Sequence, residues 1–222
     1  MEELYTKLLE IHGPQGKWWP GSPEEIFVSA ILTQNTNWSN VEKAMDNIKR
    51  AWEENSQADF SLLEFLYHLD DKQISELIKP AGFYNIKTAR LKHLLNWLKN
   101  YEFDPKAFER KDTKTLRQEL LDIKGIGKET ADSILLYALE RPVFVVDAYT
   151  KRLLKRIFNL KLENYDQIQN LFHQTYPPDT RLYQELHGLI VEHAKLLCKA
   201  KPLCTRCLIS SCGYRIISND DQ

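Results

Sequence analysis

The sequence predicts an all-α protein, because its apolar residues repeat at helical spacing and no stretch alternates over two residues as a half-buried strand does. Two capping boxes, Ser22–Glu25 and Ser61–Glu64, indicate where helices begin, and Pro23 lies at the first helical position of one of them. Apolar residues make up 43% of the 222 residues, which is enough to build a folded core.

The remaining elements follow in chain order. A further capping box at Ser39–Glu42 predicts that the next helix begins there. A short helix around residues 74–78 is expected to stop at Pro80 and Gly82. Other helices are predicted near the N-terminus and at residues 85–100, 113–121, 129–139, 149–158, 166–172 and 180–197. Residues 143–146 are apolar but directly follow a proline, so we expect an extended linker there rather than a strand.

Charge and hydropathy limit the partners. The net charge is −1, from 30 basic and 31 acidic residues, which by itself counts against a nucleic-acid binder. Residues 195–215 nevertheless contain five basic and no acidic residues, so one basic face can bind phosphates or simply be solvated. No apolar run is long enough to cross a membrane, and the charged N-terminus lacks the core of a signal peptide. We expect a cytoplasmic, nucleoid-associated protein.

A glycine turn and one acid are the first candidates for function. The turn Lys124–Lys128 contains Gly125 and Gly127, which permit unusual dihedrals and a close approach of the backbone to a surface. The amides of the turn and of the following helix favour an anion such as phosphate, although such turns also occur as plain connections between helices. Asp147 follows about twenty residues later, after the apolar linker.

All four cysteines lie within fifteen residues, at Cys198, Cys204, Cys207 and Cys212. In a cytosolic chain this clustering favours metal binding over disulfides. Thiolates suit both iron–sulfur clusters and zinc.

These residues together resemble a known family. Leu121-x-x-Lys124-Gly-Ile-Gly-x-x-Thr130-Ala, followed by Val-Val-Asp147, is similar to the helix-hairpin-helix and Gly/Pro…Asp motif of the endonuclease III-like DNA glycosylases. The resemblance implies a six-helix barrel at residues 22–139 and a second helical domain formed by residues 1–21 and 140–222. Double-stranded DNA would lie in the cleft between these two domains.

The resemblance also assigns roles to the cysteines and to the hairpin. It implies a [4Fe–4S] cluster in the loop of residues 198–212, although each long spacer between the cysteines is one residue shorter than in the family; zinc remains the alternative. The residues expected to contact the DNA backbone are Lys124, Gly125, Ile126, Gly127, Lys128 and Thr130.

The same family places the chemistry at Asp147. A carboxylate beside the sugar stabilises the positive charge that develops as the glycosidic bond breaks, and it can activate water. An aspartate before a helix is also a common N-cap, and both roles can hold together. Members that also cut the strand carry a lysine where this chain has Glu129. Since a glutamate cannot form a Schiff base, we expect a monofunctional enzyme without AP lyase activity.

The flanking segments Trp18-Trp19-Pro20 and Ala81-Gly-Phe-Tyr-Asn85 most resemble the 3-methyladenine DNA glycosylase III subgroup. A cationic alkylated purine is a good leaving group, and aromatic rings can select it by stacking and cation–π attraction. The candidate recognition residues are Trp18, Trp19, Gln34, Trp38 and Tyr149, with Gln34 at a position that probes the gap left by the flipped base. Each aromatic residue can equally belong to the core.

Three alternatives stay open at this point: a uracil or thymine mismatch glycosylase, a bifunctional endonuclease III-type glycosylase and AP lyase, and a helix-hairpin-helix module that binds DNA without catalysis. Such a module needs Gly125 and Gly127 but has no use for Asp147. We expect the protein to act on damaged DNA as a monomer.

Overall fold

The computed structural model describes residues 1–55 and 60–214, so Arg215, the last member of the basic run, lies outside the described part. Every regular element in these residues is a helix, which confirms the all-α prediction. The chain divides into two compact units, one formed by residues 19–141 and the other by residues 1–18 with 142–222.

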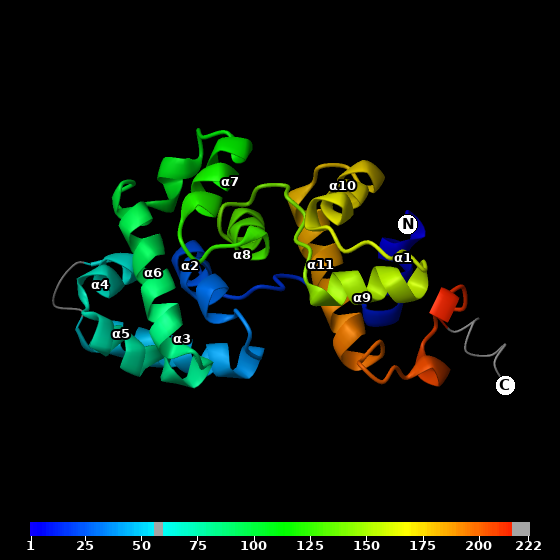
Figure 1. Ribbon diagram of the computed structural model, residues 1–222, viewed down its shortest axis with the longest axis horizontal. Helices are drawn as coiled ribbons and strands as arrows, with labels where there is room; N and C mark the ends of the chain where they lie inside the picture. Colours follow the sequence, from blue (N-terminus) through cyan, green and yellow to red (C-terminus); the bar gives the residue numbers. More distant parts are fainter. Residues whose placement is uncertain (56–59, 215–222) are drawn as a thin grey trace. The chain divides into compact units, whose positions relative to one another are not determined.

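Helix α2 (Pro23–Leu32) is the centre of the unit of residues 19–141 (Figure 1). Its last seven residues are all buried, because other helices pack on every side of it. The other α-helices of this unit are α3 (Trp38–Glu54), α4 (Leu62–His68), α5 (Asp71–Ile78), α6 (Tyr84–Lys99), α7 (Thr113–Asp122) and α8 (Lys128–Ser133), with short 3₁₀ turns at Lys79–Ala81 and Pro105–Phe108.

The predicted helix starts are confirmed at two of the three capping boxes. The side chains of Ser22 and Ser61 each accept a hydrogen bond from the backbone N–H three residues later. The backbone N–H of each serine in turn donates to the side chain of the glutamate at that position. The box at Ser39 is wrong. The side chain of Asn37 accepts a hydrogen bond from Asn40 N at 3.1 Å, so the N-cap lies two residues before the predicted one and α3 begins at Trp38.

The helix predicted at residues 129–139 changes character along its length. It is α-helical only to Ser133 and continues as a π-helical turn, η3 (Ile134–Ala138), in which Leu139 N donates to Ile134 O at 3.1 Å. Glu140 then takes a left-handed conformation with φ 51°, which ends the helix.

The other unit is formed from both ends of the chain. Its helices are α1 (Glu3–His12), α9 (Ala148–Ile157), α10 (Tyr165–Thr175) and α11 (Thr180–Leu196). Helix α1 packs on α11, and just after α1 Gln15 N donates to Glu185 Oε1 of α11 at 2.6 Å. At the end of α10, Tyr176 Oη donates to Met1 O at 2.7 Å.

Residues 143–146 form the extended linker that the sequence predicts, and all four are buried. A buried segment without a strand partner needs other hydrogen bonds for its backbone. Tyr165, Gln169 and His173, at successive turns of α10, supply them: Phe144 N donates to His173 Nε2 at 3.0 Å, Gln169 Nε2 donates to Phe144 O at 2.7 Å, and Val146 N donates to Tyr165 Oη at 3.3 Å. Helix α10 thereby fixes the position of Asp147 at the end of the linker.

Candidate functional site

The predicted site residues are divided between the two units. The hairpin, Gln34, Trp19 and Trp38 belong to residues 19–141, and Asp147, Trp18, Tyr149 and the four cysteines belong to the other unit.

The hairpin turn joins α7 to α8. Gly125 has φ +96°, a conformation that strains other residues, whereas Gly127 is extended at φ −95° and ψ 178° and could be replaced on conformational grounds. The expectation that both glycines are needed for their dihedrals is therefore wrong for Gly127. No atom lies within 4 Å of where its Cβ would stand, so the missing side chain leaves the start of α8 accessible. Gly127, Lys124 and Lys128 are at least partly exposed, whereas the side chains of Ile126 and Thr130 are buried.

Side chains of helix α6 contact this turn. The Arg90 side chain packs so closely on Gly125 that a Cβ there would lie 2.4 Å from Arg90 Cγ. His93 Nδ1 lies 3.0 Å from Lys124 O. Neither Arg90 nor His93 stands out in the sequence, because the contact joins helices some thirty residues apart.

Gln34 is held against the same turn. Its Nε2 donates to Thr130 Oγ1 at 3.0 Å and to Gly125 O at 3.3 Å, and its Oε1 accepts from Arg90 Nη1. The predicted probe residue is thus anchored to the hairpin through both ends of its amide.

The candidate aromatic residues separate into two groups. Trp19 is buried, donates Nε1–H to Ser29 Oγ at 2.9 Å, and lies edge-on to Trp38 and against Tyr137, with ring centroids 5.6 and 5.1 Å away. Trp38 is half-buried and donates to Glu42 Oε1 at 3.1 Å. Tyr137, which sequence reasoning missed, lies on the π-helical turn.

Trp18 belongs to the other unit and packs on Gly188 of α11, where an added Cβ would lie 2.9 Å from Trp18 Cγ. Lys195 Nζ lies 5.6 Å from its ring centroid, so a cation already occupies this face of the indole. Tyr149, in the first turn of α9, has the Arg152 guanidinium 5.1 Å from its ring centroid.

Asp147 is the N-cap of α9. Its Oδ1 accepts from Thr150 N at 2.7 Å and from Thr150 Oγ1 at 2.8 Å, and its Oδ2 lies 3.6 Å from His187 Nε2. Burial alone would raise the pKa of this carboxyl, but His187 and Thr150 outweigh that effect, so its pKa is below the usual value. The Asp147 side chain is 12% exposed, and a largely buried carboxylate that stays ionised is suited to stabilising positive charge.

Glu129 lies in the first turn of α8 and its side chain is exposed. A carboxylate favours this end of a helix because of the helix dipole. Lys128, one residue earlier, is half-buried.

The four cysteine side chains, none of them in a disulfide, line one cavity of about 330 Å³, which includes space open to solvent. Arg156 Nη1 donates to Cys198 O at 3.1 Å and lies 3.4 Å from Cys198 Sγ, and Arg152 Nε donates to Cys198 O at 2.9 Å. His193 Nε2 lies 3.7 Å from Cys207 Sγ. In the described residues, no three His, Cys, Asp or Glu side chains converge to hold a single ion. Four thiols around one cavity, with Arg156 also lining it, fit an anionic cluster whose irons each take a separate thiolate.

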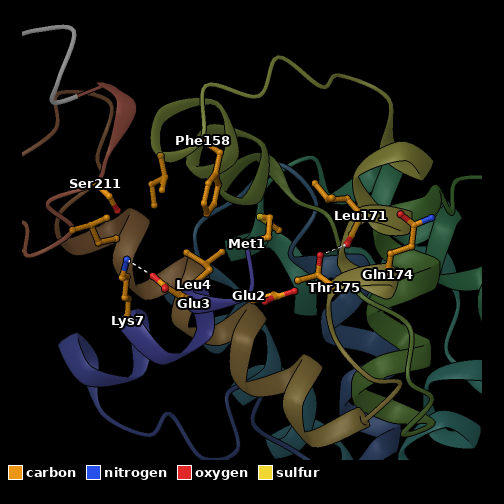
Figure 2. A pocket seen from close by; sticks show the side chains of 12 residues that line it. Met1, Glu2, Glu3, Leu4, Lys7, Phe158, Leu171, Gln174, Thr175 and Ser211 are labelled. Atoms are coloured by element: carbon orange, nitrogen blue, oxygen red, sulfur yellow. Dashed lines mark hydrogen bonds and ion pairs between the residues drawn. The ribbon is translucent and has the colours of Figure 1, made fainter.

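A further pocket, of about 1030 Å³ including open solvent, lies on the same unit and contains none of the predicted site residues (Figure 2). It is lined by the start of α1, the end of α9, part of α10 and the segment around Ser211, and the Lys7–Glu3 ion pair of 2.7 Å lies at its edge.

Sequence reasoning missed two more residues with unusual environments. Phe83 is 65% exposed and has a left-handed φ of 47°, a combination that costs free energy and often marks a contact residue. The segment Ala81–Asn85 carried a family resemblance but gave no sign of this exposure. His187 is buried beside Asp147, from which it is separated by forty residues.

No described helix is long and apolar enough to span a membrane.

Comparisons with known proteins identify the family. Residues 28–178 match the family model for the HhH-GPD superfamily base excision DNA repair proteins. A protein of Methanocaldococcus jannaschii named as a DNA repair glycosylase is 47% identical over 214 residues, covering 93% of this chain and 92% of that protein. The solved structure of H. pylori 3-methyladenine DNA glycosylase bound to 1,N6-ethenoadenine is similar with a TM-score of 0.77 and 32% identity, covering 87% of this chain and 96% of that one.

A non-covalent endonuclease III–DNA complex shares the fold, with a TM-score of 0.78 at 17% identity and coverage of 97% of this chain and 95% of that one. The chain is therefore a base excision DNA glycosylase of the HhH-GPD superfamily.

Proposed function

We propose that this protein is a monofunctional glycosylase that hydrolyses the N-glycosidic bond of alkylated purines such as 3-methyladenine in double-stranded DNA and leaves an abasic site. The observation that carries the chemistry is Asp147, a largely buried carboxylate, 12% exposed, that Thr150 and His187 keep ionised. The similarity to the H. pylori enzyme, at 32% identity, supports the substrate class.

The proposed reaction uses few groups. A flipped base is removed as its bond to the sugar breaks, and the Asp147 carboxylate stabilises the oxocarbenium ion that develops. Water then attacks the sugar carbon and transfers its proton to the carboxylate. An alkylated, cationic purine leaves as a neutral base, so the reaction needs no general acid.

The hairpin is proposed to bind the DNA backbone. Its exposed turn, with Gly127 free of steric neighbours and Lys124 and Lys128 beside it, offers amides and charge to a phosphate. In the same unit, the exposed Phe83 and the half-buried Trp38 are proposed to contact bases, because accessible aromatic rings stack on them.

The absence of lyase activity follows from Glu129. Strand cleavage through a Schiff base requires an amine aimed at the sugar carbon, and a carboxylate cannot form one. Lys128 is about 100° away around the helix, so it does not replace the missing amine.

We further propose that Cys198, Cys204, Cys207 and Cys212 hold a [4Fe–4S] cluster rather than zinc. When bound, the cluster supplies a covalent brace for the basic loop, and Arg152 and Arg156 offset its negative charge. Metal analysis of the purified protein tests this, since we expect about four irons per chain. Stoichiometric zinc, or a protein free of both metals, would contradict the assignment.

The function is tested by incubating the protein with duplex DNA methylated by a simple alkylating agent, separating released bases by chromatography, and measuring nicks before and after alkali. We expect release of 3-methyladenine, with nicks only after alkali. Release of uracil or mismatched thymine in place of alkylated bases would favour the mismatch alternative. Nicks without alkali would show that an amine, Lys128 first, acts as a lyase.

A further inference from the structure

The two oxygens of the Asp147 carboxylate have different surroundings. Oδ1 accepts two hydrogen bonds from Thr150, one from its backbone N–H and one from its hydroxyl. These hold the helix start and occupy the lone pairs of Oδ1. Oδ2 instead faces the imidazole of His187 at 3.6 Å, so it is the oxygen left to face a sugar or a water.

We propose that His187 is a positioning residue for Asp147, whose imidazole orients Oδ2 while Thr150 holds Oδ1, so that the carboxylate stays aimed at the sugar. The inference rests on the proposed role of Asp147 and adds a residue to its site. His187 is not required to touch the DNA for this role.

Core packing holds the imidazole of His187 in place. His187 lies in the middle of α11 and is only 4% exposed. The ring of Phe144, from the linker that leads to Asp147, lies edge-on to it, with centroids 6.3 Å apart and planes at 85°. Phe144 is itself stacked on Phe172 of α10 at 3.8 Å. Because the linker and α11 pack together through this contact, the distance between the carboxylate and the imidazole is set by core packing.

The distance of 3.6 Å is longer than a strong hydrogen bond. Catalytic hydrogen bonds are often long in unliganded enzymes and shorten when substrate binds. A movement of about 0.5 Å would bring Nε2 and Oδ2 within hydrogen-bonding distance.

Histidine suits this position better than a permanently charged residue. An imidazole that carries a proton on Nε2 can donate a hydrogen bond to Oδ2. A lysine or arginine at the same place would put a fixed positive charge beside the oxocarbenium ion and repel it. The groups that lower the pKa of Asp147 are His187, from α11, and Thr150, from α9, so removing the imidazole should raise that pKa.

The test compares His187→Phe, which keeps a ring but loses the N–H donor, with His187→Gln, which keeps a donor. Single-turnover release of 3-methyladenine from methylated duplex DNA is measured across pH, together with affinity for DNA that carries an abasic-site analogue. We expect His187→Phe to slow release on the order of 100-fold with unchanged affinity, because a misplaced carboxylate loses alignment. Its acid limb should move to higher pH, since Asp147 then protonates more readily.

His187→Gln should recover most of the rate and most of the pH profile, which a purely structural role for the ring would not predict. If His187→Phe does not fold, His187→Gln is compared with His187→Ala, which has neither ring nor donor. The proposal is overturned if His187→Gln changes the release rate and the acid limb as much as His187→Ala does.

Asp147→Asn separates this inference from the proposed function. An inactive Asp147→Asn protein beside a fully active His187→Phe protein would refute the role of His187 alone. Full activity in Asp147→Asn would refute the proposed chemistry itself. Adding His187→Phe to Asp147→Asn should cause little further loss, because both act through one group.

Discussion

The two hairpin glycines offer a matched test, because the structure predicts opposite consequences for the same change. At Gly125 an alanine would have to adopt φ +96°, and its Cβ would lie 2.4 Å from Arg90 Cγ. The strained backbone costs about 1–3 kcal/mol, and Arg90 must also move off the turn and loosen Gln34. At Gly127 an alanine adopts an allowed extended conformation and meets no atom within 4 Å.

The assay is thermal unfolding of both variants by calorimetry. For a chain of this length about 1 kcal/mol corresponds to roughly 2–4 °C in Tm, so Gly125→Ala should lower Tm by roughly 2–12 °C. Gly127→Ala should stay within about 1 kcal/mol of wild type, because the entropy gained by replacing glycine offsets a poorer N-cap. Equal Tm values for the two variants would refute the reasoning about the turn.

The same pair tests the proposed phosphate site. A methyl group at Gly127 stands at the start of α8, where the phosphate is proposed to bind, so Gly127→Ala should weaken DNA binding by about tenfold without unfolding the protein. Fluorescence anisotropy with abasic-site DNA measures this. Unchanged affinity would show that the phosphate does not bind at the start of α8.

Two further predictions concern stability, and a third concerns the packing of Trp18. Arg117→Met removes a bidentate ion pair to Asp132, which is fully buried, and should destabilise the protein by roughly 3–5 kcal/mol in chemical denaturation; a loss under 1 kcal/mol would contradict it. Burial lowers the pKa of Lys87 to about 8, so the unfolded chain binds this proton more tightly and stability should rise from pH 8 to 10.5. In Lys87→Met, the free energy of unfolding should no longer rise over this pH range. If it still rises, another group is responsible. Gly188→Ala should displace Trp18 and change its fluorescence, whereas an unaltered spectrum would contradict the contact.

Local signals in the sequence predicted the helices well. The boxes at Ser22 and Ser61 gave correct helix starts because capping involves residues only three apart. Ser39 misled because Asn37, two residues earlier, competes for the same role and is an equally good cap. The π-helical turn at residues 134–138 has no comparable local signal, since it maintains the same apolar pattern as an α-helix.

The candidate site was predicted only as far as its motifs extend. The hairpin and Asp147 belong to short sequence patterns, so their positions were visible. Arg90 and His187 lie beside Gly125 and Asp147, which are 35 and 40 residues away in the chain, and these contacts depend on how α6 and α11 pack. Trp18 and Trp19 are neighbours in sequence but belong to different units, which adjacency alone could not reveal.

The ionised carboxylate of Asp147 is proposed to perform the hydrolysis of an alkylated purine. The most direct measurement is single-turnover release of 3-methyladenine by wild type and by Asp147→Asn, with DNA affinity and Tm measured for both. We predict that the variant binds DNA normally and stays folded, because an asparagine still caps α9, but loses at least about 100-fold in rate. Release at the wild-type rate by a variant that binds equally well would contradict the account.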